Sequence, residues 1–399
     1  MANDRIGQRD ILPSGVRRRN EHPLERAYSA IISPPGRNQV GEFSDIQKAF
    51  DYVRDLGGGS ILVLPGTYQI PRNLVIYSNT QLIGLVTAGC IFDFNRSTYN
   101  LATEPNPVDI RIENMTFKNC WNTTVGTIYL NGTGGSAQRI TIINCKFDNN
   151  KNGSNQGYDI YATISDSVLV TRCFATNGAT FYFANNSADI NEVSFNNIED
   201  YSDYIFEGGS TGNGAGQTKY DNNYILDSIN SVFFGKFSLA NIINNRATWG
   251  SATLTQIALD FNSSNSMKVV GNDILASTGG HVAMDLNACN QNQFSANRFL
   301  GSEASTPIIN LDTSDANVFT GNYIDTDDLS DGMDGIKLTT SDRNVITGNY
   351  IDGSSGGTAY GVNISNSTSD NNTVVGNFLN AVTGDTNDAG TGSTIASND

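Results

Sequence analysis

A short motif recurs along most of the 399-residue chain, and no other sequence feature restricts the fold as strongly. Its clearest copies are NVFTGNYID at 317–325, NVITGNYID at 344–352 and NTVVGNFLN at 372–380, and weaker copies occur throughout residues 82–380. Such a repeat indicates a solenoid, in which each repeat is one coil that cannot bury its apolar edge without its neighbours. The Asn of the Gly-Asn pair is the anchor of each copy, and the anchors are Asn196, Asn223, Asn245, Asn272, Asn297, Asn322, Asn349 and Asn377.

Asn suits the anchor position for a physical reason. Each coil must turn sharply after a short strand, and Asn tolerates the left-handed backbone conformation that this turn needs. Strands of neighbouring coils lie about 4.8 Å apart, so the anchors are predicted to form a ladder in which each amide bonds the next. Upstream, Met115, Cys145 and Cys173 fill the same slot. The two Cys are therefore expected to be buried neighbours on consecutive coils and to remain thiols.

The repeat divides the chain into three segments. Residues 1–42 do not repeat, are rich in Arg and contain three Arg in a row at 17–19, which is typical of a flexible tail or of a basic attachment segment that orders on a partner. Residues 43–380 are predicted to form the coils. Residues 381–399 lose the pattern and are predicted to be an end segment.

One amphipathic helix is predicted ahead of the coils, at residues 44–56. Ser44 is expected to cap it, and Gly57-Gly58-Gly59 ends it. A short apolar strand follows at 61–64, so the helix is expected to cover the open end of the coil stack. The apolar residues at helical spacing are Ile46, Ala49, Phe50 and Val53.

Charge and apolar patterning exclude several classes of function. The formal net charge of −16 argues against duplex nucleic acid as a partner. No apolar run reaches the roughly 18 residues that a membrane-spanning helix needs, so no membrane insertion is expected. The N-terminus lacks the apolar stretch of a secretion signal. Five Cys are an odd number, which excludes a complete disulfide framework.

With the capping helix, the stretch GGGSILVLPGTY and the Gly-Asn repeat, residues 43–380 resemble the pectin-lyase-like right-handed parallel β-helix superfamily. The resemblance implies an all-β, single-stranded right-handed parallel β-helix of about twelve coils. It is specific for fold alone, because the superfamily includes pectate lyases, polygalacturonases, alginate epimerases and viral tail spikes. The polygalacturonase motifs Gly-His-Gly and Arg-Ile-Lys, the epimerase motif Asp-Pro-His and the pectate lyase motif Arg-x-Pro-x-x-Arg do not occur in the sequence.

Among these members the chain most resembles a tail spike or receptor-binding protein of a tailed virus, because a short Arg-rich head precedes the β-helix. The resemblance implies a location on the virion and recognition of a host polysaccharide or glycoprotein glycan. It also implies attachment to other virion proteins through residues 1–42 and assembly as a homo-oligomer, with a trimer expected. Whether the glycan is also cleaved stays open. The alternatives are a stand-alone polysaccharide lyase or glycoside hydrolase, and a purely structural or decorative virion protein.

A second strand follows the anchor in each coil, and alternation predicts that its outward residues form one column. Tyr rings offer flat faces on which sugars stack, and carboxyls one or two strands apart resemble the paired acids of glycosidases. The coil at 231–238 offers either Gly235 or Lys236 to the column. The candidate catalytic residues are Glu207, Asp260 and Asp285. The candidate glycan-binding residues are Tyr129, Asp159, Tyr161, Tyr182, Asn310 and Lys337.

Two simpler interpretations of the column stay open. An acidic chain places carboxyls on exposed strand positions without any ligand, and neighbouring acids also suit a structural cation such as calcium. No cofactor and no metal-binding motif are expected from the sequence.

Overall fold

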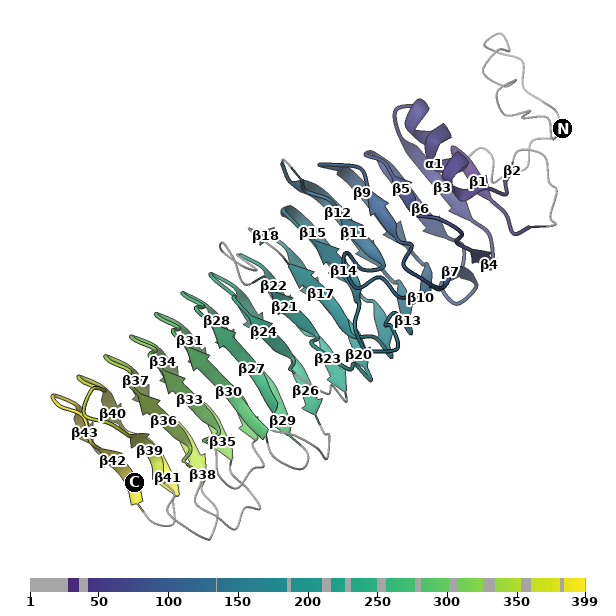
Figure 1. Ribbon diagram of the computed structural model, residues 1–399. Helices are drawn as coiled ribbons and strands as arrows, with labels where there is room; N and C mark the ends of the chain where they lie inside the picture. The colour runs from purple at the N-terminus through teal and green to yellow at the C-terminus, as the bar shows by residue number, and fades with distance from the viewer. Residues whose placement is uncertain are drawn as a thin grey trace.

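A stack of parallel strands makes up nearly all of the computed structural model, which describes residues 28–35, 42–133, 135–184, 188–209, 217–226, 231–249, 256–276, 281–300, 307–325, 334–352, 360–380 and 384–398. The strands lie in three sheets that run along the whole molecule (Figure 1). The chain passes through sheets A, B and C in turn, and one such pass is a coil. The architecture is the predicted right-handed parallel β-helix.

Sheet A contains 17 strands. They are β1 (Ala30–Ile32), β2 (Glu42–Phe43), β3 (Gly59–Val63), β6 (Thr80–Gly84), β9 (Val108–Glu113), β12 (Ala137–Ile143), β15 (Ser165–Thr171), β18 (Ala188–Asp189), β19 (Glu192–Ser194), β22 (Lys219–Asp221), β25 (Asn241–Ile243), β28 (Lys268–Val270), β31 (Gln293–Ser295), β34 (Val318–Thr320), β37 (Val345–Thr347), β40 (Thr373–Val375) and β43 (Thr394–Ala396).

Among the described residues, sheets B and C contain 13 strands each, so the coil count differs slightly from the predicted twelve. Sheet B contains β4 (Gly66–Gln69), β7 (Cys90–Ser97), β10 (Thr116–Cys120), β13 (Lys146–Asp148), β16 (Phe174–Thr176), β20 (Asn197–Glu199), β23 (Tyr224–Leu226), β26 (Arg246–Trp249), β29 (Asp273–Ala276), β32 (Arg298–Leu300), β35 (Tyr323–Asp325), β38 (Tyr350–Asp352) and β41 (Phe378–Asn380). Sheet C contains β5 (Leu74–Ile76), β8 (Leu101–Thr103), β11 (Ile128–Leu130), β14 (Tyr158–Ala162), β17 (Thr180–Ala184), β21 (Phe206–Gly208), β24 (Phe233–Gly235), β27 (Gln256–Asn262), β30 (His281–Asn287), β33 (Ile309–Asp312), β36 (Ile336–Thr339), β39 (Tyr360–Ile364) and β42 (Gly384–Asp388).

The predicted Asn ladder is present between sheets A and B. From Asn196 to Asn377, each anchor donates from its side-chain nitrogen to the side-chain oxygen of the next anchor, at 2.9–3.0 Å, and Asn377 donates to Asn398 at 3.1 Å. Each anchor also donates to a backbone carbonyl of the preceding coil. The ladder thus satisfies buried polar groups without water.

The left-handed residue lies one position earlier than predicted. The positive φ angle belongs to the residue before the anchor, such as Asn222, Gly321 or Gly348, and not to the anchor itself. Gly precedes Asn in the strong copies because it adopts this conformation without steric cost. The anchor is therefore selected for its amide alone.

A second Asn ladder, which we did not predict, lies at the start of the sheet A strands. Asn292, Asn317, Asn344 and Asn372 bond one another at 2.9–3.2 Å in the same direction as the anchors. Cys145 and Cys173 are buried, free and on consecutive coils, as predicted, with the Phe174 amide donating to the Cys145 carbonyl at 2.9 Å.

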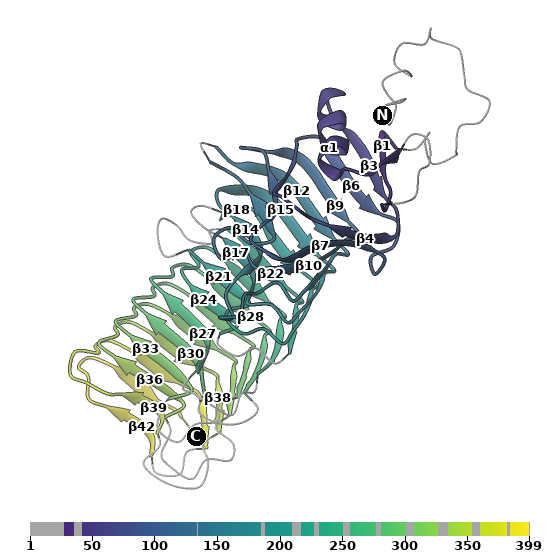
Figure 2. The same ribbon diagram turned by 45° about the vertical axis from the view of Figure 1, so that its right-hand side comes forward.

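The single helix of the described residues, α1 (Ile46–Asp55), lies at the N-terminal end of the stack (Figure 2). Its four predicted apolar residues are all buried. Its cap is Asp45 and not Ser44, because the Asp45 carboxylate accepts hydrogen bonds from the amides of Gln47 and Lys48, at 3.0 and 3.3 Å. In the described part of the chain, no helix is long and apolar enough to cross a membrane.

The strands reach beyond the predicted boundaries of the coil segment at both ends. Strand β1 pairs with β3, so sheet A begins inside the predicted segment 1–42, of which residues 1–27 lie outside the described residues. Strands β42 and β43 pair with β39 and β40 inside the predicted segment 381–399. The weak sequence pattern there still supplies strands because the preceding coil provides a complete edge to pair with.

Candidate functional site

One column of side chains runs along the outer face of sheet C, at a single register position on each strand. From Tyr129 to Asp285 it spans six strand spacings, or about 29 Å. We call it the sheet C column. Its members are Tyr129, Tyr161, Phe183, Glu207, Phe234, Asp260, Asp285, Asn310, Lys337, Asn363 and Asn387.

Seven of the nine predicted site residues lie in this column, and Tyr182 and Asp159 do not. Tyr182 is fully buried, and its neighbour Phe183 holds the column position. Asp159 is also buried, where it accepts hydrogen bonds from the Asn150 amide at 2.9 Å and from the Tyr201 hydroxyl. Burial raises the pKa of Asp159 to about 7. Both residues are therefore part of the core and are removed from the candidate site.

The coil whose register was ambiguous contributes an aromatic ring. Phe234 pairs with Glu207 on one side and with Asp260 on the other, so it holds the position predicted for Gly235 or Lys236. The ring of Phe234 stacks on Tyr204, with centroids 4.0 Å apart and planes 8° apart. The strand of Phe234 thus places an apolar ring between the strands that carry Glu207 and Asp260.

The N-terminal part of the column is a cluster of tilted rings. Tyr161 lies 4.6 Å from Phe183 and 5.9 Å from Tyr129, measured between ring centroids. Tyr158, which the sequence pattern did not identify, meets Tyr161 edge to face at 5.3 Å. We call Tyr129, Tyr158, Tyr161 and Phe183 the aromatic cluster.

Glu207 lies in the column between Phe183 and Phe234. Burial raises the pKa of Glu207 to about 8, and the nearby carboxylate of Asp203 adds to the shift. The same carboxyls, with burial as the main cause, raise the pKa of Tyr204 to about 12. Glu207 is therefore largely protonated at neutral pH and is able to donate a proton.

Asp260 and Asp285 are paired on adjacent strands beyond Phe234. Burial, followed by the charge of Asp285, raises the pKa of Asp260 to about 6, so it is largely ionised at pH 7. The pKa of Asp285 is also raised by burial, but the Asn310 amide donates to its carboxylate at 2.9 Å and opposes the shift. Glu207 and Asp260 are two strand spacings apart, about 10 Å between backbones.

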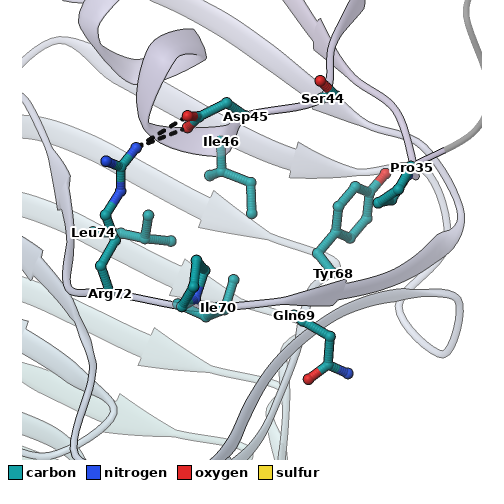
Figure 3. A pocket seen from close by; sticks show the side chains of 10 residues that line it. Pro35, Ser44, Asp45, Ile46, Tyr68, Gln69, Ile70, Arg72 and Leu74 are labelled. Atoms are coloured by element: carbon teal, nitrogen blue, oxygen red, sulfur yellow. Dashed lines mark hydrogen bonds and ion pairs between the residues drawn. The ribbon is translucent and has the colours of Figure 1, made fainter.

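A cavity of about 470 Å³ lies elsewhere, beside the N-terminal helix (Figure 3). Its polar groups already bond one another: Arg72 pairs with the capping carboxylate of Asp45 at 3.1 Å, and the Tyr68 hydroxyl donates to the Leu64 carbonyl at 2.7 Å. These contacts leave the column as the stronger candidate. Among the described residues, no group of three or more His, Cys, Asp or Glu is arranged to hold a metal ion.

No protein-family model matches the chain, and no curated protein matches it in sequence. Solved structures do match. The DFA-IIIase of Arthrobacter chlorophenolicus A6 in complex with GF2 is 12% identical with a TM-score of 0.57, covering 89% of this chain and 96% of that one. The A-module of mannuronan C-5 epimerase AlgE6 of Azotobacter vinelandii is 13% identical with a TM-score of 0.55, covering 88% and 94%.

A surface adhesin also has this fold. PfbA of Streptococcus pneumoniae is 12% identical with a TM-score of 0.50, covering 84% of this chain and 92% of that one. At these identities the comparisons show the fold alone. The chain has the pectin-lyase-like right-handed parallel β-helix fold.

Proposed function

We propose that this protein binds a polysaccharide lengthwise along the sheet C column, as a glycan-recognising projection on the surface of a tailed virus. The single observation that carries the glycan proposal is the column itself. Rings and carboxyls, all half-buried except the buried Phe183, follow one another at a constant spacing over about 29 Å, along the axis of the molecule.

Each part of the column suits a sugar chain. The aromatic cluster offers apolar ring surface to the C–H faces of sugars, and the carboxyls and the Asn310 amide offer hydrogen bonds to hydroxyl groups. Proteins of the same fold include an enzyme crystallised with a ligand named GF2, a mannuronan epimerase and a surface adhesin. These neighbours support an interaction with a glycan.

The virion part of the proposal depends on the N-terminal residues. Their Arg-rich, non-repeating sequence contrasts with an acidic chain of net charge −16 and suits docking to an acidic partner on the particle. Deleting residues 1–27, which precede β1, should leave the β-helix folded while preventing incorporation into the particle. Normal incorporation of the deleted protein would contradict the proposal.

Glycoside hydrolysis is a second candidate function, favoured by the different pKa values of Glu207 and Asp260. Glu207 would give its proton to the glycosidic oxygen as the C–O bond breaks. Asp260 would take a proton from the water that attacks the anomeric carbon. The backbones that carry these two residues are about 10 Å apart. Enzymes that invert the anomeric centre hold their two carboxyl groups about 6.5–9.5 Å apart.

The test is binding and cleavage by the purified full chain. A panel of host cell-surface polysaccharides is incubated with the wild type, and affinity and released reducing ends are measured. A triple variant, Tyr129→Ala, Tyr161→Ala and Phe183→Ala, should lose most of the affinity. The Tyr350→Ala variant on sheet B is the matched aromatic control. Unchanged affinity in the triple variant would move the site off this column.

A further inference from the structure

We infer that the bound polysaccharide is neutral, and that the column selects against chains with a carboxylate on each sugar. This inference rests on the proposed function, because it names the substrate class of the same site. It is supported by the charged side chains along and beside the column, and by the rings of the aromatic cluster.

The ligand-facing part of the column contains acids but no base. Between Tyr129 and Asp285 its acidic members are Glu207, Asp260 and Asp285, and of these Glu207 is largely protonated at pH 7. Two further acids lie next to them: Asp203 acts electrostatically on Glu207, and Asp312 acts on Asp285.

Two bases are nearby, and neither lies among these acids in the column. Lys236 directly follows β24, the strand between those of Glu207 and Asp260, and it lies two residues beyond the column position of Phe234. Lys337 lies in the column two strands beyond Asp285, with Asn310 between them. Acids therefore outnumber bases along this stretch of the face.

A linear uronan laid along this face would bring its own carboxylates close to those of the protein. The strand spacing of about 4.8 Å keeps Asp260 and Asp285 within contact distance of consecutive parts of the same ligand. Like charges about 4 Å apart repel even in water, and repel more strongly where burial lowers the local dielectric constant. Each such encounter should weaken binding about fivefold.

A neutral sugar chain has no carboxylates, so it is not repelled by the acids of the column. Its hydroxyl groups donate hydrogen bonds to the carboxylates of Asp260 and Asp285, which are acceptors when ionised. Its ring faces lie on the aromatic cluster, where the attraction depends on apolar surface and not on charge. The same residues that repel a uronan are therefore useful to a neutral glycan.

The experiment compares chemically matched ligands on the full chain. Hexasaccharides of glucose, mannose and galactose, in both anomeric linkages, are titrated beside the corresponding glucuronic, mannuronic and galacturonic acid hexasaccharides, at pH 7 with a chelator. We expect one or more neutral hexasaccharides to bind at least tenfold more tightly than its acidic counterpart, and added salt to narrow the difference by screening.

The results distinguish a failure of the inferred preference for neutral glycans from a failure of the proposed glycan site. Tight binding of an acidic hexasaccharide with weak binding of its neutral counterpart overturns the inference and leaves the glycan site standing. Binding of an acidic chain that appears only when calcium replaces the chelator also overturns it, because a cation then mediates recognition. If no member of the panel binds, the proposed glycan site itself fails.

A charge variant with a matched control isolates the cause. In the double variant Asp260→Asn and Asp285→Asn, the acidic-to-neutral affinity ratio should rise about fivefold or more. Asp325→Asn with Asp352→Asn is the control, because these two acids are paired on adjacent strands of sheet B and the net charge changes equally. If the control raises the ratio as much, overall charge and not the column sets the selectivity.

Discussion

Two sets of aromatic rings lie on the outside of the β-helix, and they differ in how the rings meet. On sheet B, Tyr323, Tyr350 and Phe378 occupy one register position on three consecutive strands, and we call them the sheet B ladder. Their centroids are 5.1 and 4.8 Å apart and their planes are within 10° of parallel. In the aromatic cluster of sheet C, by contrast, Tyr161 meets Tyr129 at 68° and Tyr158 at 80°.

The difference teaches that exposure alone does not define a binding surface. Tyr350 and Phe378 are 36% and 49% exposed, whereas Phe183 is only 8% exposed. The stacked rings of sheet B cover one another's faces, so mainly their edges reach the solvent. The tilted rings of sheet C are followed along the column by half-buried carboxyls whose pKa values are raised. We therefore propose ligand binding for sheet C and stabilisation of the stack for the sheet B ladder.

The largest expected difference between the sheet C column and sheet B is in catalysis. If the column cleaves its glycan, Glu207→Gln should lower the turnover number about a hundredfold or more, because the amide is not a general acid. Asp352→Asn, which removes an acid from sheet B, should change turnover less than twofold. Release of reducing ends at saturating substrate measures both. Equal losses in the two variants would remove the distinction between the faces.

The pH dependence should report the two carboxyls of sheet C. Hydrolysis needs Asp260 ionised and Glu207 protonated, so kcat/KM should rise as pH passes about 6 and fall as it passes about 8. The folded-state pKa of Glu207 lies above its unfolded value of about 4.3, so the folded protein loses stability as pH rises between these values. Glu207→Gln should therefore be more stable relative to wild type at pH 9 than at pH 4, as urea unfolding measures. If the difference in unfolding free energy between the variant and the wild type is the same at pH 4 and pH 9, Glu207 is exposed to water and its pKa is not raised.

A smaller contrast is expected in affinity. Tyr161→Ala should weaken glycan binding about fivefold, the equivalent of about 1 kcal/mol for an aromatic contact. Tyr350→Ala should leave the affinity unchanged, although Tyr350 is 36% exposed. Titration calorimetry with the tightest-binding hexasaccharide measures both, and a loss of affinity in Tyr350→Ala alone would exchange the roles of the two faces.

The smallest contrast is in stability. Tyr350 stacks on a ring on each side, so Tyr350→Ala should lower the free energy of unfolding by about 1 kcal/mol beyond the loss of its own buried area. Phe378→Ala, at the end of the ladder, should lose about half of that stacking contribution. Denaturant unfolding of the two variants measures the difference. Equal costs would show that the ladder does not act through stacking.

Most of the fold was predictable because one interaction, the hydrogen bond between Asn anchors of neighbouring coils, repeats along the chain. The anchors form a ladder although the spacing between them varies from 22 to 28 residues, since the variable residues lie in the connections. Strand β43 was not predicted, because its sequence lacks the Gly-Asn pair and only the exposed edge of β40 specifies its position.

The site was predictable only where polar and apolar residues alternate. Apolar and polar residues alternate from Leu259 to Asn262, and Asp260 was placed correctly in the column. Thr180–Ala184 is buried at all five positions, so alternation could not distinguish Tyr182 from Phe183. Asp159 was misplaced because its partners, Asn150 and Tyr201, come from distant parts of the sequence.

Because the anchors bond one another from coil to coil, the β-helix can be shortened or lengthened by whole coils. Removing residues 224–245 would delete one coil and bring Asn223 against Asn272, where the chain of amides closes again. The same deletion removes Phe234 and places Glu207 on the strand next to Asp260. The backbones of the two carboxyl-bearing strands would then be about 5 Å apart instead of about 10 Å. This brings the two carboxyl groups closer together, and retaining glycosidases hold theirs about 5–5.5 Å apart. Loss or duplication of a single coil is thus a route by which the stereochemistry of a β-helix hydrolase changes in one step.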